Sequence, residues 1–441
     1  MGTETACTKS EIDLYRPIDV QVALTDGRFQ TYYPINSLAS SHVIDFLIPG
    51  TSNEVIDMNN ISIYVRGKFT KADGGELVAA DTLVPANNLL HTMIRSCDVC
   101  VNGQLLTRAS KDYAYKDYLT KLTQVDMPRG GRKESQLIME GFYLDDAGDP
   151  AAAANTTLAE RKKIITTSKA FELCGPLAVD LFQCDRSLIM GSDISLKIQL
   201  NDPAFYMIDN NATTADRITP KLVLESVELY VRRVTVADTF VNALNSQLKV
   251  QDAIYPYTRR EIQAISMPSG TTTFTRENLF RGQLAVRYFF AMVHSRHYAG
   301  LINASPFYFQ NFGISEIALM ENGQNMTQSA PLKMDFTTAN QTRVVNAYHL
   351  FLESIGAVGD RALNCPIDLA RFCNGFTVFC FTRSPDLTHG CNHLPNQTGN
   401  LTLQLNFATA TSNPIVILCM AEFDSRIQIN EHRNIVTDFA V

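Results

Sequence analysis

Few residues of this chain have the types and spacing that catalysis or metal binding requires. Cys97 and Cys100 form half of a zinc or redox motif. Residues three apart on a strand point to opposite faces, and the sequence has no second cysteine pair with this spacing to complete a zinc site. We therefore expect both thiols to be structural.

A second group consists of His389, Cys391 and His393, which occupy alternating positions. Alternating side chains share one face of a strand, so all three could reach one metal ion if the segment is extended. The segment follows Pro385, which favours a loop, and no fourth ligand can be identified. We prefer the loop and predict no metal here. Zinc binding remains the alternative, and elemental analysis of the purified protein would decide it.

The sequence also argues against several classes of enzyme. His294 and His297 lack the glutamate of a helical metalloprotease motif. A cupin oxygenase needs a His-x-His pair closely followed by a glutamate, and no such pair occurs. A phosphate-binding loop, a nucleophile elbow and dinucleotide-binding glycines are missing too. We predict no catalytic, cofactor-binding or metal-binding residue and no enzyme, with a doubled cupin and a lectin-like module as alternatives.

The elements that would position such residues are mostly β-strands. Apolar and polar residues alternate in short runs, as in strands with one buried face. The clearest runs are 194–201, 227–231, 284–288 and 401–407. Clusters of Gly, Pro and Asn separate the runs, which is typical of β-sandwiches and barrels.

Three segments have helical spacing instead. Apolar side chains recur three and four residues apart in 111–124 and in 346–355, and 238–248 is a third candidate that could join two domains. Tyr115 and Tyr348 take matching places in the first two segments. We expect these tyrosines to play paired structural roles at the open end of a sandwich.

Length and charge limit the possible functions. The chain has 441 residues, more than one core usually holds, so two domains are expected. Its net charge is -7 and no Lys/Arg-rich tail is present, so we expect no tight or sequence-specific nucleic-acid binding. No apolar run is long enough for a membrane span and no signal segment is recognisable, so we expect neither a membrane span nor secretion.

Residues 143–163 are expected to form a long exposed excursion. The segment runs from an acidic stretch through Ala151–Ala154 to the basic group Arg161–Lys163. Loops of this length inside a compact domain are usually functional or mobile. We expect this loop and both chain termini to contact neighbours or solvent rather than a core.

Short motifs of the first half recur in the second half in the same order. The pairs are Ile48–Thr51 with Met267–Thr271, Asn102–Gln104 and Thr107 with Asn322–Gln324 and Thr327, Ala114–Leu119 with Ala347–Leu352, Ile198–Asn201 with Leu403–Asn406, and Glu228 and Arg232 with Glu422 and Arg426. We expect them to mark a strand entry, a tight hairpin, a packed helix, an alternating strand and a closing strand. The sequence therefore predicts an all-β fold of two tandem jelly-roll sandwiches with short inserted helices. The expected division is an arm at 1–15, a jelly roll at 16–236, a linker helix at 237–249, a second jelly roll at 250–430 and an arm at 431–441.

Several motifs are also those of one known family. They are Ser10–Tyr15, Tyr33–Ile35, Val43–Gly50, Ile56–Met58, Val84–His91, Asp98, Val99, Asn102 and Tyr113–Tyr118 in the first half, and Tyr255, Pro256, Met267–Gly270, Pro306–Phe312, Asn374, Gly375, Pro385–Leu387 and Ala421–Asp424 in the second. On these residues the chain resembles the double jelly-roll major capsid proteins of Polinton/Maverick elements and adintoviruses over about residues 10–440. Val84–His91 is the most specific motif, and the 143–163 loop and the Cys-rich tail depart from the pattern.

That resemblance implies a structural protein without a cofactor. It implies a homotrimer that forms a pseudo-hexameric capsomer of an icosahedral shell around a DNA genome. The implied partners are neighbouring capsomers and a single-jelly-roll penton or minor capsid protein. The implied location is the virion, after synthesis in the cytoplasm or nucleus of the host. An acidic chain would then act as the wall of the shell and not as a nucleoprotein.

Overall fold

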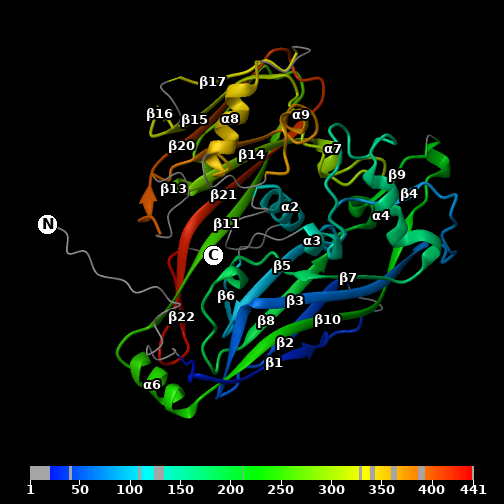
Figure 1. Cartoon of the computed structure of the whole chain (residues 1–441). Helices are drawn as coiled ribbons and strands as arrows, with labels where there is room; N and C mark the ends of the chain where they lie inside the picture. Colours follow the sequence, from blue (N-terminus) through cyan, green and yellow to red (C-terminus); the bar gives the residue numbers. More distant parts are fainter. Residues whose placement is uncertain are drawn as a thin grey trace, which may run out of the picture.

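The chain folds into two lobes, which Figure 1 shows as a blue-to-green lobe and a green-to-red lobe. The structure, a computed structural model, describes residues 20–38, 42–107, 111–123, 134–211, 213–326, 330–337, 343–358, 365–385 and 393–439. Both lobes consist mainly of antiparallel sheets, and the helices are short. The prediction of an all-β fold is confirmed.

The first lobe is built from two four-stranded sheets. Its strands are β1 (Leu24–Tyr32), β2 (Val43–Ile48), β3 (Glu54–Lys71), β5 (Ile94–Val101), β6 (Gln104–Leu105), β7 (Phe171–Pro176), β8 (Ile194–Leu200) and β10 (Pro220–Val236). One sheet has the order β1-β10-β3-β7 and the other has the order β2-β8-β5-β6. The alternation in β8 turns Ile194, Leu196 and Ile198 into the core, as its sequence pattern predicts.

The second lobe repeats this arrangement. Its strands are β11 (Ala253–Met267), β12 (Thr273–Arg276), β14 (Arg287–His294), β15 (Ile314–Glu321), β16 (Gln324–Asn325), β18 (Val378–Thr382), β20 (Leu401–Phe407) and β21 (Ile415–Ile429). Its sheets have the orders β11-β21-β14-β18 and β12-β20-β15-β16. Strand by strand this is the order of the first lobe, so the chain holds two copies of one jelly roll. The predicted double jelly roll is confirmed.

Shorter elements connect and extend the sheets. The strands are β4 (Leu83–Pro85), β9 (Met207–Asp209), β13 (Gln283–Leu284), β17 (Leu332–Lys333), β19 (Gln397–Thr398) and β22 (Ile435–Thr437). The helices are α1 (Leu89–Thr92), α2 (Tyr113–Thr123), α3 (Glu134–Met139), α4 (Thr157–Ile165), α5 (Pro203–Tyr206), α6 (Asp238–Leu248), α7 (Ser295–Tyr298), α8 (Val345–Ser354) and α9 (Leu369–Cys373). The three helices expected from spacing are α2, α6 and α8. Within the described residues, no helix has both the length and the apolar character that crossing a membrane requires.

The strand expected across 284–288 is interrupted. β13 ends at Leu284 and β14 begins at Arg287. Between them the Ala285 N–H donates to the Tyr288 hydroxyl, at 2.7 Å, instead of to a neighbouring strand. This side-chain bond replaces the ladder bond that a continuous strand would make, so this prediction was wrong.

The same asparagine hairpin occurs in both lobes. Asn102 and Asn322 have φ of 48° and 51°, and the glycines that follow them also have positive φ, as a tight two-residue hairpin requires. Each asparagine side chain also fastens the hairpin to the strand that pairs beside it. The Asn102 Oδ1 accepts the backbone N–H of Asp193, at 2.8 Å, and the Asn322 Oδ1 accepts that of Asn400, at 2.9 Å. The predicted pairing of these two hairpins is therefore confirmed, although Thr327 lies outside the described residues.

Three further sequence pairs occupy equivalent places, and one does not. The helix pair lies in α2 and α8, the alternating pair in β8 and β20, and the closing pair in β10 and β21. Ile48, however, ends β2, and Met267 ends β11, which is the counterpart of β1. Each motif therefore lies at the end of a strand and not at its beginning, and the two strands, β2 and β11, are not counterparts. The match of Ile48–Thr51 to Met267–Thr271 was wrong because short Pro-Gly turns recur between many strands.

The hydrophobic cores are shared between the lobes. The core of the second lobe includes Tyr118 and Leu122 of α2, together with Phe142, all from the first half. The core of the first lobe includes Tyr255 from the N-terminal end of β11 and Ile427 from the C-terminal end of β21. Neither half could bury its own apolar surface alone, so the lobes form one folded unit.

Residues 143–163 are packed into the molecule, so the prediction of an exposed excursion was wrong. The Asp145 and Arg161 side chains are both fully buried, and the Asp145 Oδ1 lies 2.7 Å from the Arg161 Nη2. The Asn155 side-chain amide also donates to Asp145 Oδ1, at 2.7 Å. One acidic and one basic residue of this segment therefore neutralise each other inside the protein, whereas Lys163 is exposed and pairs with Glu160.

The same segment touches the second lobe. The Gly148 N–H donates to the carbonyl of Asn374, at 2.9 Å. The next residue, Gly375, has φ of 101° and lies directly against the Gly148 backbone. A segment that looked like a free loop is thus part of the contact between the lobes.

The end of the chain also returns to the sheet. β22, in the segment expected to be a free C-terminal arm, pairs with β21. Phe439 packs against the Arg259 guanidinium, with 4.4 Å between the guanidinium carbon and the ring centre. Residues 1–15, the other expected arm, lie outside the described residues.

Two glycine substitutions test the contact between the 143–163 segment and the second lobe. Gly103→Ala should cost about 1–2 kcal/mol of unfolding free energy, because a Cβ is strained at positive φ but meets nothing there. Gly375→Ala should cost roughly 1–3 kcal/mol more, because its Cβ would also collide with the Gly148 carbonyl oxygen. Denaturant unfolding of both variants measures the difference. Equal losses would show that the Gly148 contact is absent.

Candidate functional site

The candidate cysteines lie together on β5 but do not form a site. Cys97 is buried and Cys100 is half-buried. Burial raises the pKa of Cys97 to about 12, so this thiol stays protonated at neutral pH. The geometry agrees with a structural role.

Of the candidate group His389, Cys391 and His393, the structure describes His393 alone. His389 and Cys391 lie outside the described residues. His393 is exposed, with its Nδ1 3.8 Å from Asp424 Oδ1. Metal binding by this group therefore stays the untested alternative.

The pair His294 and His297 is explained by local structure. Their rings stack with 5.3 Å between the ring centres. The Nδ1 of His294 accepts the backbone N–H of Arg296, at 3.1 Å, and so caps α7. The His294 side chain therefore has a structural role at the N-terminus of α7.

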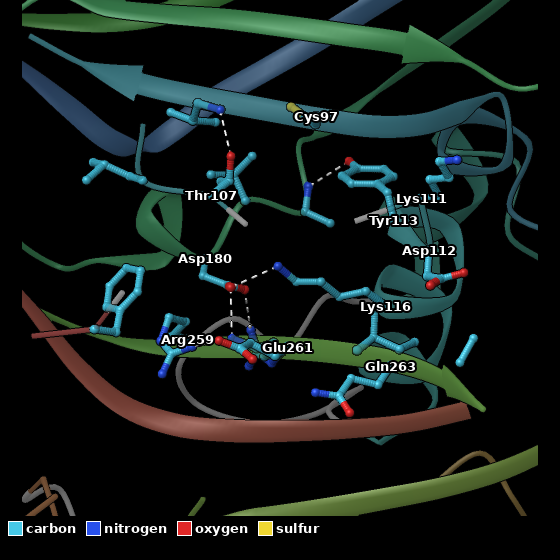
Figure 2. A pocket seen from close by; sticks show the side chains of 18 of the residues that line it. Cys97, Thr107, Lys111, Asp112, Tyr113, Lys116, Asp180, Arg259, Glu261 and Gln263 are labelled. Carbon is cyan, nitrogen blue, oxygen red and sulfur yellow. Dashed lines mark hydrogen bonds and ion pairs between the residues drawn. The ribbon is translucent and has the colours of Figure 1, made fainter. Parts of the chain in front are cut away.

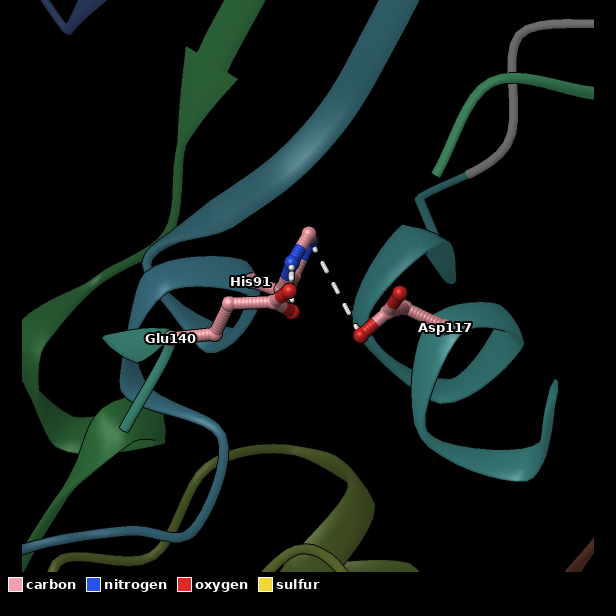
Figure 3. Close-up of side chains that lie close together, drawn as sticks. All are labelled: His91, Asp117 and Glu140. Atoms are coloured by element: carbon pink, nitrogen blue, oxygen red, sulfur yellow. Dashed lines mark hydrogen bonds and ion pairs between the residues drawn. The ribbon is translucent and has the colours of Figure 1, made fainter. Parts of the chain in front are cut away.

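A cluster of buried polar side chains lies where α1, α2 and α3 meet. Its titratable members are His91, Asp117, Lys121 and Glu140, and each is at most 6% exposed. Figure 3 shows His91 between Glu140 on one side and Asp117, which projects from α2, on the other. The His91 Nε2 lies 3.0 Å from Glu140 Oε2, and its Nδ1 lies 3.8 Å from Asp117 Oδ2.

His91 is neutral in this cluster. Burial lowers its pKa more than the nearby carboxylates Asp117 and Glu140 raise it. A neutral ring donates from one nitrogen and accepts at the other. The geometry fits a ring that donates from Nε2 to Glu140 and accepts at Nδ1 from the Tyr113 hydroxyl, which is 3.0 Å away.

Lys121 occupies the place that a metal ion would take. Among the described residues, His91, Asp117 and Glu140 are the one group with three ligand atoms close enough to hold a cation. The Lys121 Nζ lies 2.6 Å from Asp117 Oδ2 and 2.5 Å from Glu140 Oε2. It also donates to the Asn88 Oδ1, at 2.6 Å. The carboxylates thus already bind an ammonium ion, and a metal does not fit beside it.

A second buried charge group lies at the junction of the lobes. The Glu422 carboxylate on β21 binds Arg260, with 2.8 Å from Oε1 to Nε, and Arg287, with 2.6 Å from Oε2 to Nη2. Burial alone would raise the pKa of Glu422, but attraction to both guanidinium groups outweighs burial and keeps it below the usual 4.5. Glu422 therefore stays ionised and balances two buried cations.

A cavity of about 720 Å³ lies along the same junction, between β5 and α2 on one side and β11 on the other. In Figure 2, Lys116 and Asp180 point toward each other across it. The Asp180 Oδ2 lies 2.8 Å from Lys116 Nζ and accepts the Arg260 backbone N–H, also at 2.8 Å. The Tyr298 hydroxyl donates to Asp112 Oδ1, at 2.7 Å. The bonds of Asp180 to Arg260 and of Tyr298 to Asp112 link first-lobe to second-lobe residues, so the cavity follows the seam between the lobes.

Aromatic stacking holds α2 against the second lobe. The Tyr118 ring stacks on the Phe307 ring with 4.0 Å between their centres, and the Tyr115 ring stacks on the Tyr298 ring at 5.6 Å. In the second lobe Tyr348 is only half-buried, and its hydroxyl donates to the Ile367 carbonyl at 2.9 Å. The two tyrosines occupy equivalent helices, but only Tyr115 is covered by another lobe.

Sequence reasoning did not identify the buried cluster, although several of its residues lie in the motifs that carry the family resemblance. Asn88 and His91 come from the Val84–His91 motif, and Asp117 comes from the Tyr113–Tyr118 motif. Polar residues on the apolar face of a predicted helix were the available signal. This pattern indicates which residues need a buried partner, but it does not indicate which residue the partner is.

The fold belongs to the class of double jelly rolls seen in viral major capsid proteins. The mavirus major capsid protein has a TM-score of 0.57 at 12% identity, covering 100% of this chain and 96% of its own. The faustovirus major capsid protein has a TM-score of 0.58 at 9% identity, covering 95% and 92%. A chain of the Sputnik virophage structure has a TM-score of 0.65 at 13% identity, covering 99% and 93%.

Sequence comparison identifies a relative from an animal. An uncharacterized protein of Caenorhabditis elegans is 23% identical over 434 residues, which are 96% of this chain and 99% of that protein. No protein-family model matches the chain. The double jelly roll is therefore established by structure, at identities too low to establish more than the fold.

The first prediction from the junction concerns Tyr115. Tyr115→Ala should cost about 3 kcal/mol or more of unfolding free energy, because it empties a space between the lobes that is closed on all sides. Tyr115→Phe is the matched control and should keep full stability, since the buried hydroxyl has no hydrogen-bond partner among the described residues. Thermal and denaturant unfolding measure both. Wild-type stability of the alanine variant would contradict the packing.

The second prediction concerns Glu422. Glu422→Gln should cost roughly 3–5 kcal/mol at neutral pH, because Arg260 and Arg287 then lose their buried counter-charge. The folded pKa lies below the usual 4.5, so the carboxylate stabilises the fold above that pH and loses this contribution as the pH falls through the folded pKa. The unfolding free energies of wild type and variant, measured by denaturant unfolding at a series of pH values, should therefore converge as the pH falls.

The equivalent residue of the first lobe supplies the control for that measurement. Glu228 is half-buried and accepts hydrogen bonds from Ser226 and Tyr230, both at 3.0 Å. Glu228→Gln should cost under about 1 kcal/mol, as for other solvent-accessible polar contacts. Similar losses in both variants would show that Glu422 is not the centre of the junction.

Proposed function

We propose that this chain is a major capsid protein whose trimers form pseudo-hexameric capsomers of an icosahedral shell around a DNA genome. The observation that carries the proposal is the presence of two copies of one jelly roll, joined by shared cores. Three such chains around a threefold axis present six similar lobes, which suits a hexagonal lattice. The shared fold with the mavirus and faustovirus major capsid proteins supports this. The sequence motifs further suggest kinship with Polinton/Maverick and adintovirus capsid proteins.

The division of the chain that we propose has jelly rolls at 16–236 and 250–430, a linker helix at 237–249, and terminal segments at 1–15 and 431–441. All eight main strands of each lobe fall within the proposed limits, and α6 lies between β10 and β11. The terminal segment 431–441 then adds β22 to the second lobe.

The role that we propose is structural and not enzymatic. The partners would be two further copies of the chain, neighbouring capsomers and a single-jelly-roll penton or minor capsid protein. We propose no tight nucleic-acid binding, in line with a net charge of -7. The protein would be made in the cytoplasm or nucleus of the host and reside in the virion.

One edge of the first lobe has the properties of an assembly surface. β1 is the end strand of its sheet, and large apolar side chains are exposed on it and beside it. Phe29, Tyr33 and Ile35 are 59%, 66% and 69% exposed. Soluble proteins usually protect such edges, so we infer that a neighbouring copy of the chain covers this one.

The first experiment is the mass and shape of the purified protein. A trimer should have about 147 kDa, three times 49.0 kDa, and a pseudo-hexagonal outline in negative-stain images. Light scattering gives the mass. A stable monomer that never assembles would leave the fold intact and exclude the capsomer.

Substitution of the exposed edge tests where the copies meet. Phe29→Asp should shift the trimer toward monomer without lowering the melting temperature of the monomer, because the side chain is largely exposed. Val78→Asp places the same charge at another exposed apolar position and should leave assembly unchanged. Trimers that form equally well from both variants would place the interface elsewhere.

A further inference from the structure

Lys121 and Asn88 have the geometry of two groups that can join covalently. The Lys121 Nζ lies 2.6 Å from the Asn88 side-chain oxygen, one bond from the amide carbon. The Asn88 backbone is held in the left-handed region, with φ of 60°, at the N-cap of α1. Its side chain makes no capping hydrogen bond and is directed to the cluster instead. A nucleophile and an amide are thus fixed within reach of each other.

One carboxylate oxygen contacts both nitrogen atoms that such a reaction involves. The Asp117 Oδ2 lies 2.6 Å from the Lys121 Nζ and accepts from the Asn88 Nδ2, at 2.7 Å. Asp117 can therefore take a proton from the attacking amine and give it to the leaving amide nitrogen. A second carboxylate, Glu140, lies 2.5 Å from the same Nζ and can accept the other proton.

The surroundings favour loss of charge. Lys121, Asp117 and Glu140 are 6%, 2% and 1% exposed, and the Phe142 ring centre is 5.9 Å from the Lys121 Nζ. Three ionised groups in such a place are costly, and the neutral His91 adds no further cation. A reaction that converts the ammonium to an amide and leaves Glu140 protonated reduces the three buried charges to one.

We propose that Lys121 and Asn88 form an intramolecular isopeptide bond. Lys121 first transfers a proton to Asp117, and its free amine attacks the Asn88 Cγ from above the amide plane, forming the C–N bond. The carbonyl electron pair moves to Oδ1, and the attacking nitrogen gives its second proton to Glu140. The electron pair then returns, the Cγ–Nδ2 bond breaks, and Asp117 protonates the departing nitrogen, which leaves as ammonia. No oxidant, reductant or further reactant is needed.

The bond would fasten the helix that joins the lobes. Lys121 lies near the C-terminal end of α2, which carries Tyr115 and Tyr118 into the second lobe. Asn88 follows β4 in the first lobe. The link would join two residues 33 positions apart in the chain and tie α2 permanently to the lobe from which it projects. This inference does not depend on the capsid assignment.

Peptide mapping of the intact chain by tandem mass spectrometry tests the proposal directly. A protease digest of purified wild-type protein should contain one branched peptide that joins the Asn88 and Lys121 segments and is lighter than the two together by one ammonia molecule. Recovery of both segments as separate, unmodified peptides from folded protein would overturn the proposal.

Three variants separate this reaction from its alternatives. Lys121→Arg keeps the positive charge but cannot form the bond, so the segments should separate and Asn88 should retain its amide. Loss of ammonia at Asn88 that persists in this variant would identify a succinimide and overturn the proposal. Asp117→Asn removes the group that moves the proton and should leave most of the chain unlinked. Lys116→Arg, on the same helix but paired with Asp180, is the matched control and should stay linked.

Discussion

The burial of α2 between the lobes is the constraint on which the rest of the structure depends. The helix projects from the first lobe, and its tyrosines Tyr115 and Tyr118 stack on aromatic rings of the second. Because apolar contact covers the helix, its polar residues cannot reach water and must find partners inside the protein. Asp117 and Lys121 both bond to Asn88, and Lys121 also pairs with Glu140. These partners explain why a dense polar cluster lies so deep in the protein.

Buried charges then define how the lobes sit against each other. Asp180 joins Lys116 of α2 to Arg260 of β11, and Glu422 holds the same arginine from the other side. Ion pairs of this kind add little net stability over well-packed apolar residues, but one misplaced partner leaves an uncompensated charge. They therefore penalise other arrangements of the lobes. The capsomer of six lobes that we propose would need such a fixed angle, because an error within each chain would be repeated around the threefold axis.

Local patterns predicted much of the fold, and their failures share one cause. Alternation identified β8 and β20 to within a residue and the middle of β10, helical spacing identified α6, and the repeated asparagine hairpin revealed the duplication. The segment 143–163 was misjudged because Asp145 and Arg161 look solvent-exposed until each is seen to be the other's partner. The candidate site was missed for the same reason: the motif residues were noticed, but Asn88 and Lys121 lie 33 positions apart and meet only after folding.

The sequence by itself thus determined several of the strands, that one sandwich occurs twice, and that the chain is acidic and long enough for two lobes. These properties depend on neighbours along the chain, because the period of apolar residues sets which face is buried. The tertiary structure alone decided that the lobes share their cores, that α2 lies between them, and that a lysine takes the place of a metal ion. Those outcomes depend on which distant charged groups lose water together, and no local pattern contains that information.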